Sequence, residues 1–175
     1  MKSLRSIPRI LKINKITGYY VSCLFSNGES RAIDFKNFFK RDGKRIKKNH
    51  PSYKLTTDIK EFTKVELIGN SLGWRNAGIW MKDFSGIEKF YPYELDPIVL
   101  YEFSEKDEKQ SLQIGKKIKT ERLKAGLTQE QLAIKSGTSK HYISRLENSK
   151  SDIELLTLKK IVEAGLGKEM EIEIY

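Results

Sequence analysis

The hydrophobic pattern of this sequence changes its period once, and that change most constrains the fold. In the first 34 residues apolar and polar residues alternate, as in "RILKINKI" and "YYVSCLF", with turn residues at Thr17-Gly18 and Asn27-Gly28. Beyond residue 112 the apolar residues recur at helical spacing, as in "IGKKIKTERLKAG". A period of two is typical of strands, and a period near 3.6 is typical of amphipathic helices. The sequence therefore predicts an α+β protein of two domains.

Residues 1–103 are predicted to form a β-rich domain with one short helix. Three strands are expected in the alternating stretch, and "DFKNFFK" predicts a helix that Asp34 caps and whose apolar face carries Phe35, Phe38 and Phe39. Further strands are expected in "FTKVELIG" and "LGWRNAGIW", with turns at Gly69-Asn70 and at 76–78. Two prolines in "YPYELDPIVLYEF" exclude a long helix there.

Two features of this domain leave alternatives open. The stretch from Lys40 to Lys48 carries six basic residues and one acidic residue. It could grip a nucleic-acid backbone, but we favour a solvated loop, because no aromatic residues are interleaved. The aromatic residues further on would indicate a sensor if they lined an open cleft, and would be core if they were buried; they are Trp74, Trp80, Phe90, Tyr91 and Tyr93.

Residues 104–111, "SEKDEKQS", contain no apolar residue and are expected to be a linker or the first turn of the next helix. Residues 112–166 predict a bundle of four helices. The first carries Ile114, Ile118 and Leu123, a capping box of Thr128 and Gln131 begins the second, and Ser139 caps the third. The fourth is expected to face inward with Leu155, Leu158, Ile161 and Val162.

The second and third helices have the ingredients of a helix-turn-helix. Small Ala133 allows a close crossing, Gly137 accepts the positive φ of the turn, and Ile143 and Leu146 hold the third helix to the core. Residues 112–150 carry 9 basic and 3 acidic side chains. Such a local positive field suits a site that faces phosphates.

The stretch "LTQEQLAIKSGTSKHYISRLENSK" resembles the lambda-repressor and Cro-like class, the XRE family of bacterial and phage regulators. The resemblance covers about residues 112–166 and implies a helical bundle whose third helix enters the major groove. It also implies the DNA-binding positions Gln129, Ser139, Lys140, His141, Tyr142, Ser144, Arg145, Asn148 and Lys150. Arg122 and Glu147 match a pair that forms a structural salt bridge in this family, so no DNA contact is expected from them.

The C-terminal stretch, residues 168–175, alternates strictly and predicts a strand with no partner in its own domain. "GLGKEMEIEIY" resembles the end of antitoxin-type XRE proteins, which implies pairing with the same strand of a second subunit. The dimerisation residues would be Met170, Ile172 and Ile174. A homodimer then predicts a palindromic site on double-stranded DNA, with recognition helices about 34 Å apart.

The N-terminal domain has a resemblance of its own. "GYYVSCLFSNGESRAIDF" and "ELDPIVLY" are similar to a small bacterial domain family of unknown function that is found fused to such helix-turn-helix domains. The resemblance implies strands with a short helix and no activity. In that family a tryptophan strand leads directly into the second motif, whereas here Trp74 is followed by the longer "RNAGIWMKDFSGIEKFYPY".

Several other classes of function are disfavoured. The sequence has no stretch suited to a membrane span or a signal peptide, so we expect a cytoplasmic protein without a membrane partner. The only cysteine, Cys23, sits in an apolar strand, and with His50 and His141 it lacks the spacing of a zinc site. No catalytic set or phosphate loop appears, and Glu94 with Asp96 is interpreted as a turn, so neither an enzyme nor a cofactor is expected.

These observations favour a sequence-specific DNA-binding transcriptional regulator, with a repressor as the preferred form. The N-terminal domain would then sense, interact or add DNA contacts. The alternative is an antitoxin that binds a toxin protein and autoregulates its operon, and this alternative shares the DNA-binding half.

Overall fold

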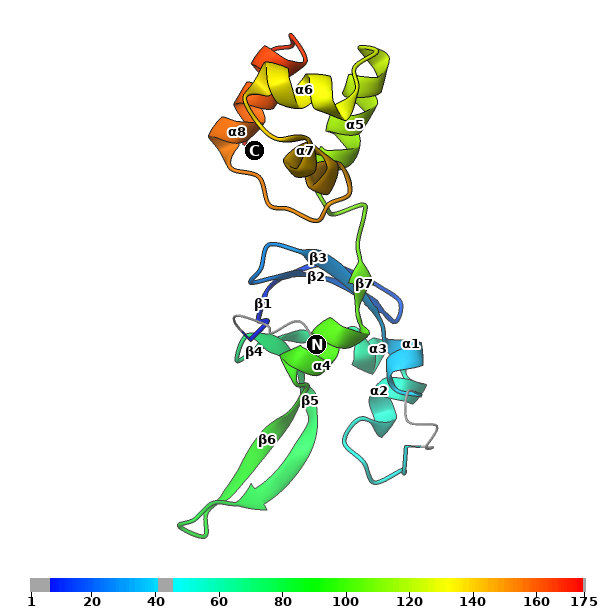
Figure 1. The fold of residues 1–175 in the computed structure, drawn as a ribbon. Coiled ribbons are helices and arrows are strands. Elements are labelled where there is room, and N and C mark those ends of the chain that lie inside the picture. Colours follow the sequence, from blue (N-terminus) through cyan, green and yellow to red (C-terminus); the bar gives the residue numbers. More distant parts are fainter. Residues whose placement is uncertain (1–6, 41–45, 175) are drawn as a thin grey trace. The chain divides into compact units, whose positions relative to one another are not determined.

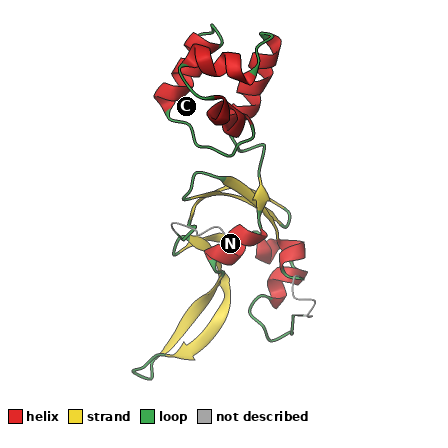
Figure 2. Cartoon of the chain, viewed as in Figure 1, coloured by secondary structure: helices red, strands yellow, loops and turns green. Residues whose placement is uncertain are grey.

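The computed structural model describes residues 7–40 and 46–174 of the 175-residue chain. The chain divides into two compact units, with the boundary between residues 111 and 112. The N-terminal unit contains the strands together with short helices, and the C-terminal unit is helical (Figure 2). The α+β class with two domains is therefore confirmed.

Two antiparallel sheets frame the N-terminal unit (Figure 1). A four-stranded sheet has the order β1 (Ile10–Thr17), β2 (Tyr20–Phe25), β3 (Ser30–Asp34), β7 (Glu105–Lys106). A three-stranded sheet has the order β4 (Glu66–Ile68), β5 (Ser71–Lys82), β6 (Glu88–Glu94). The helices described in this unit are α1 (Phe35–Phe38), α2 (Tyr53–Thr57), α3 (Ile59–Phe62) and α4 (Pro97–Phe103).

Aromatic residues dominate the core of the N-terminal unit. Trp74 of β5 is fully buried, and its indole Nε1 donates a hydrogen bond to the carbonyl oxygen of Phe62, 2.7 Å away. Phe35 of α1 packs edge-on against Trp74, with ring centroids 5.7 Å apart. The predicted helix of "DFKNFFK" thus forms, capped by Asp34, and it buries Phe35 and Phe38. Because the buried indole N–H has its acceptor, the large apolar surface of Trp74 is buried without an unpaired donor.

The three-stranded sheet corrects two predictions. The turn predicted at residues 76–78 is wrong, because β5 continues through them with a register irregularity against β6 between Trp74 and Gly78. Glycine permits this close approach, since a Cβ atom at Gly78 would lie 2.2 Å from the carbonyl oxygen of Tyr91. The strand predicted in "FTKVELIG" is confined to β4, and Phe62 instead ends helix α3.

The segments on either side of this sheet also differ from the prediction. Residues 41–45 of the basic loop lie outside the described residues. The prediction of a linker or first helical turn at 104–111 is wrong for Glu105 and Lys106, which pair with β3 as strand β7. The guanidinium of Arg31 explains this, because its Nε donates to the hydroxyl oxygen of Ser104 at 2.6 Å and holds the end of α4 beside β3.

The C-terminal unit consists of α5 (Ile114–Lys124), α6 (Gln129–Ser136), α7 (Lys140–Glu147), α8 (Leu155–Lys160) and a π-helical turn η1 (Ile161–Gly165). The predicted capping box is present, because the Thr128 hydroxyl accepts from the Gln131 N–H and the Gln131 side chain accepts from the Thr128 N–H. The buried core contains Ile118, Leu132, Ala133, Ile143, Leu146 and Ile161. All four residues that the sequence analysis assigned to the helix-turn-helix crossing therefore lie where it requires them, three of them in the core and Gly137 in the turn.

Three predictions for this unit are wrong or not met by the single chain. Leu123 and Leu155 are 59% and 56% exposed, so neither faces inward. On α5 the inward position next to Leu123 is occupied by Arg122, whose charge is paired inside the unit. The described residues 168–174 form no strand in the single chain.

Candidate nucleic-acid interface

The turn between α6 and α7 positions the second helix tightly against the first. Gly137 ends α6 in the left-handed conformation, with φ at +63°, and the Thr138 N–H donates to the carbonyl oxygen of Ala133 at 2.9 Å. Ser139 then begins α7, because its hydroxyl accepts from the Tyr142 N–H at 3.1 Å. Ala133 is 2% exposed, so the crossing leaves no space for a larger side chain. The turn and the Ser139 cap therefore help to fix the direction of α7.

A buried ion pair ties α7 to α5. Arg122 Nε lies 2.6 Å from Glu147 Oε1, and Arg122 Nη2 lies 3.0 Å from Glu147 Oε2. The two side chains are 8% and 1% exposed. Arg122 Nη1 also donates to the carbonyl oxygen of Leu127, at 2.6 Å. These groups are turned inward, as the sequence analysis predicted for a structural pair.

Gln129 joins this pair. Its side-chain Nε2 donates to Glu147 Oε2 at 2.9 Å, so the first residue of α6 is bonded to the last residue of α7. Burial raises the pKa of the Glu147 carboxyl, but hydrogen bonds from Arg122 and Gln129 outweigh burial and hold the pKa below its ordinary value. Because Gln129 is only half-buried, its other polar atom can still face a ligand.

The outer face of α7 carries the predicted reading residues. Lys140, His141 and Arg145 are exposed, and Ser144 is half-buried. Arg145 Nη2 donates to the carbonyl oxygen of Lys150 at 3.0 Å, and the Lys150 N–H donates to the carbonyl oxygen of Arg145 at 2.8 Å. Arg145 therefore also braces the loop that follows α7, so its fork must leave that carbonyl to reach a base edge.

The remaining predicted residues have structural partners. The Tyr142 ring is partly buried against the core, and its hydroxyl donates to the carbonyl oxygen of Asp152 at 3.4 Å. Asn148 Nδ2 donates to the carbonyl oxygen of Ser144 at 2.7 Å. Ser139 uses its hydroxyl as the cap of α7. These three side chains lie near the two ends of α7.

Sequence analysis missed one acidic residue at this surface. Glu130, the second residue of α6, places its Oε2 3.6 Å from Nζ of Lys140. Both side chains are more than half exposed, so the attraction is weak and screened by salt. Even so, Lys140, the cation at the start of α7, has Glu130 as an ion-pair partner within the chain. The only signal in the sequence was the acidic residue beside Gln129, which is ordinary in the first turn of a helix.

Glycine at position 115 is a second feature that sequence analysis missed. A Cβ atom there would lie 2.1 Å from the carbonyl oxygen of Leu146 at the end of α7. Only glycine lets the start of α5 approach α7 so closely. Helix α7 is thus held at its C-terminal end by the close approach at Gly115 as well as by the ion pair.

The predicted dimerisation residues lie on the surface of the single chain. Met170 is half-buried, and Ile172 and Ile174 are 56% and 94% exposed. Leu155 and Leu156 of α8 are also exposed, at 56% and 74%. The C-terminal unit therefore shows exposed apolar side chains of the kind that a second subunit would cover.

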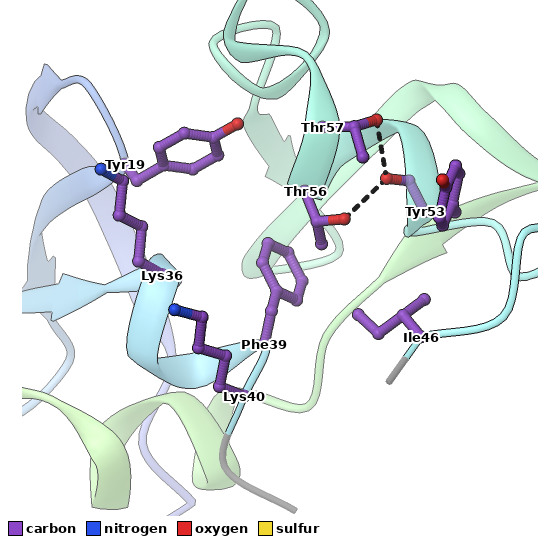
Figure 3. A pocket seen from close by; sticks show the side chains of 8 residues that line it. All are labelled: Tyr19, Lys36, Phe39, Lys40, Ile46, Tyr53, Thr56 and Thr57. Carbon is purple, nitrogen blue, oxygen red and sulfur yellow. Dashed lines mark hydrogen bonds between the residues drawn. The ribbon is translucent and has the colours of Figure 1, made fainter. Parts of the chain in front are cut away.

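The aromatic residues of the N-terminal unit divide between the two alternatives left open above. Trp74 is core and Tyr93 packs against it, whereas Trp80, Phe90 and Tyr91 are 67%, 38% and 43% exposed. None of the five lines the hollow of about 470 Å³ in this unit. Figure 3 shows that hollow, whose lining residues are Tyr19, Lys36, Phe39, Lys40, Ile46, Tyr53, Thr56 and Thr57.

Two kinds of feature were not found in the described part of the chain, a group of metal-binding side chains and a membrane-spanning helix. Within residues 7–40 and 46–174 there is no cluster of three or more His, Cys, Asp or Glu side chains placed to hold a metal ion. No described helix is long and apolar enough to cross a membrane. Cys23 is buried in β2, and burial raises the pKa of its thiol to about 12.

Comparison with known proteins singles out the C-terminal unit. Residues 118–165 match the family model described as helix-turn-helix. Among solved structures, a restriction-modification controller protein, crystallised as a tetramer with its natural 35 base-pair operator, has 33% sequence identity over 34% of this chain and 82% of that chain, with a TM-score of 0.32. No curated protein matches the chain.

Two other solved structures are similar. A restriction-modification controller protein from Aeromonas hydrophila has 28% identity over 33% of this chain and 86% of that chain, with a TM-score of 0.32. A candidate DNA-binding protein from Nitrosomonas europaea has 13% identity over 88% of this chain and 84% of that chain, also with a TM-score of 0.32.

Proposed function

The chain belongs, through its C-terminal unit, to the helix-turn-helix family of DNA-binding domains, and we propose that it is a sequence-specific transcriptional regulator. The observation that carries the proposal is the arrangement of α7. One face of this helix is held to the core by Ile143, Leu146 and the buried Glu147, and the opposite face presents exposed cations and hydrogen-bonding groups. A helix fixed in this way can enter a major groove without rearranging its own domain.

The residues of α7 would divide between base edges and phosphates. Lys140 and Arg145 can donate to guanine O6 and N7, and His141 can donate or accept. The residues that would contact the DNA backbone are Gln129, Ser139, Tyr142, Asn148 and Lys150. Ser144 would lie on the face of α7 that reads the bases. Phosphate contacts fix the register of the protein on the duplex, whereas base contacts select the sequence.

Two copies would bind together. Pairing of the C-terminal strands, residues 168–175, would cover the exposed Ile172 and Ile174 and give each strand a neighbouring strand across the two-fold axis. The restriction-modification controller protein bound to its operator as a tetramer is in keeping with such an assembly. A palindromic site follows, with half-sites about 34 Å apart.

Regulation would take the form of repression at the protein's own promoter, in the cytoplasm. A dimer bound across the promoter would block the access of RNA polymerase. A reporter gene placed behind the upstream region should therefore be silenced by the protein. The antitoxin function stays a prediction. A small protein that co-purifies with the chain and is encoded beside it would decide for that alternative.

Binding to a duplex carrying the upstream region tests the proposal. The affinity should fall steeply with salt, with a slope of about −0.9 in log K against log [salt] for each phosphate neutralised. The matched variants are Lys140→Ala, which should weaken specific binding, and Lys159→Ala, a cation on α8 outside the proposed interface, which should not. Binding that is absent from every duplex tried, or that does not respond to salt, would overturn it.

A further inference from the structure

The outer half of the β5–β6 hairpin, residues 78–92, extends away from the other elements of the N-terminal unit (Figure 1). We call these residues the aromatic arm. Its strands pair with each other from Gly78 and Pro92 to Lys82 and Glu88. It coincides with the stretch that is longer here than in the family that the N-terminal sequence resembles.

The arm is unusually apolar for a solvent-exposed element. Trp80 is 67% exposed, and its ring lies 5.5 Å from that of Phe90, the residue opposite it. Phe84 at the tip is fully exposed. Because successive residues of a strand point to opposite faces, Trp80 and Phe90 share one face of the arm, and Ile79, Met81 and Tyr91 share the other. Single exposed apolar residues are ordinary, but a face that carries a paired tryptophan and phenylalanine indicates an interaction surface. The exposed members are Ile79, Trp80, Met81, Phe84, Ile87, Phe90 and Tyr91.

The tip that presents Phe84 is ordered by one carboxylate. Asp83 Oδ1 accepts hydrogen bonds from the Ser85 N–H at 2.9 Å and from the Ile87 N–H at 3.1 Å, and Oδ2 lies 2.6 Å from Lys89 Nζ. Hydrogen bonds from Lys89 and Ser85 lower the pKa of Asp83 to about 2. The backbone of the tip is therefore ordered before any partner arrives, which reduces the entropy lost on binding.

Charge points to the kind of partner. The arm carries Lys82 and Lys89 against Asp83 and Glu88, so it has no net charge, whereas the whole chain carries +10. A neutral surface has no attraction for the phosphates of a nucleic acid. It is also the place where two strongly basic copies of this chain can meet with little repulsion, because no excess of cations lies on either side of the contact.

Area agrees with a second copy. An aromatic side chain covers roughly 150–250 Å² when fully buried, so Trp80, Phe90 and Phe84 at the tip offer on the order of several hundred Å² per copy. This is less than the roughly 800 Å² per partner of a stable interface, and it fits a weak contact that forms at high protein concentration. A two-stranded hairpin is also only marginally stable alone in water, so it gains from such packing. The same patch on two copies can pack together across a two-fold axis.

We propose that the aromatic arm packs against the aromatic arm of a second copy, with Trp80 and Phe84 buried at the contact. This contact lies in the N-terminal unit and does not depend on DNA binding or on the C-terminal strands. If both contacts form, each chain has two different partners, and four chains can join two DNA-bound pairs. The arm would then let one regulator connect two operator sites.

Sedimentation of the full chain tests the proposal. In an Ile172→Lys, Ile174→Lys background the C-terminal contact is removed, and the chain should still form dimers at about 100 µM. Adding Trp80→Ser and Phe84→Ser should raise the dissociation constant at least about tenfold. The control is Leu11→Ser, an exposed apolar residue of β1 outside the arm, which should leave dimerisation unchanged.

Fluorescence gives an independent measurement, because Trp80 is the exposed tryptophan and Trp74 is buried. In dilute protein, acrylamide should quench the emission of Trp80. As the protein concentration rises and the arms pack together, this quenching should decrease. The emission of the buried Trp74 reports that the unit is folded. A chain that stays monomeric at about 100 µM overturns the proposal. So does quenching that changes only when phospholipid vesicles are added, because the arm would then be a membrane contact.

Discussion

Arg122 of α5 and Glu147 of α7 form a two-pronged ion pair in the interior of the C-terminal unit, with N–O distances of 2.6 and 3.0 Å. Gln129 of α6 donates to the same carboxylate at 2.9 Å. One carboxylate thus connects the three helices that make up the DNA-binding element. The orientation of the recognition helix depends on this network as well as on apolar packing.

Replacing Arg122 by leucine should destabilise the C-terminal unit by about 3 to 5 kcal/mol, because the buried carboxylate of Glu147 loses its counter-charge. Urea unfolding followed by circular dichroism measures this loss. The control is Lys124→Gln, which breaks an exposed pair with Glu121 and should change the stability little, because solvent screens such a pair. A loss for Arg122→Leu as small as that of the control would show that the pair does not hold the helices.

The same network predicts a pH dependence. The pKa of Glu147 is below its ordinary value in the folded chain, so the unfolded state takes up a proton first as the pH falls. The stabilisation should be fully present above the ordinary glutamate value of about 4.3 and should disappear as the pH falls through the lowered pKa. Unfolding free energies measured between pH 7 and pH 3 should fall more steeply for the wild type than for Glu147→Gln, and parallel curves would contradict the assignment.

Gly115→Ala should loosen the contact between α5 and α7. The added methyl group would lie 2.1 Å from a backbone carbonyl oxygen, which cannot move aside as a flexible side chain can. We expect a cost of about 1 to 3 kcal/mol, as for other overpacked cores. Thr120→Ala, on the exposed side of α5, provides the comparison in thermal melts. An equal melting temperature for the two variants would show that α5 and α7 have room to separate.

Removing the charge of Glu130 should strengthen DNA binding. Glu130→Gln frees Lys140 from its partner at 3.6 Å and removes a negative charge beside the phosphate-facing start of α6. Because the pair is exposed, the gain should be modest, about two- to fivefold at low salt, and it should shrink as salt is added. The control is Glu163→Gln, which removes the same charge from η1, where the carboxylate is paired with Lys159. Titrating the same duplex with both variants separates the local effect at Lys140 from the effect of net charge. Equal affinities for the two variants would place Lys140 away from the DNA.

The helix-turn-helix could be predicted closely from sequence because its requirements are local. The capping box of Thr128 and Gln131, the left-handed Gly137 and the Ser139 cap are each determined by neighbours within a few residues, and all three formed as expected. Pairing of Arg122 with Glu147, 25 residues apart, was accessible only through the resemblance to a known family. The prediction that Leu123 faces inward was wrong. Hydrophobic periodicity assigns apolar residues to the inner face of a helix, and it cannot anticipate that the neighbouring Arg122 is buried together with Glu147.

The N-terminal unit was harder to predict because its structure depends on distant contacts. The middle of β5 was predicted to be a turn, since Asn76 and Gly78 are turn residues, yet the pairing with β6 carries the strand through them. Helices α2 and α3 are short, and tertiary packing of Leu55 and Phe62 rather than propensity accounts for them. The strand β7 depends on pairing with β3, which the contact of Arg31 with Ser104 across 73 residues supports.

Selection of binding sites from random duplex DNA tests the central claim most directly, because it measures function, symmetry and spacing together. The account predicts a palindromic sequence whose half-sites lie one helical turn apart, about 34 Å, and whose preferred bases change when Lys140 or His141 is replaced by alanine. Recovery of no preferred sequence, or of one that these two substitutions leave unchanged, would contradict the assignment of α7 as the recognition helix.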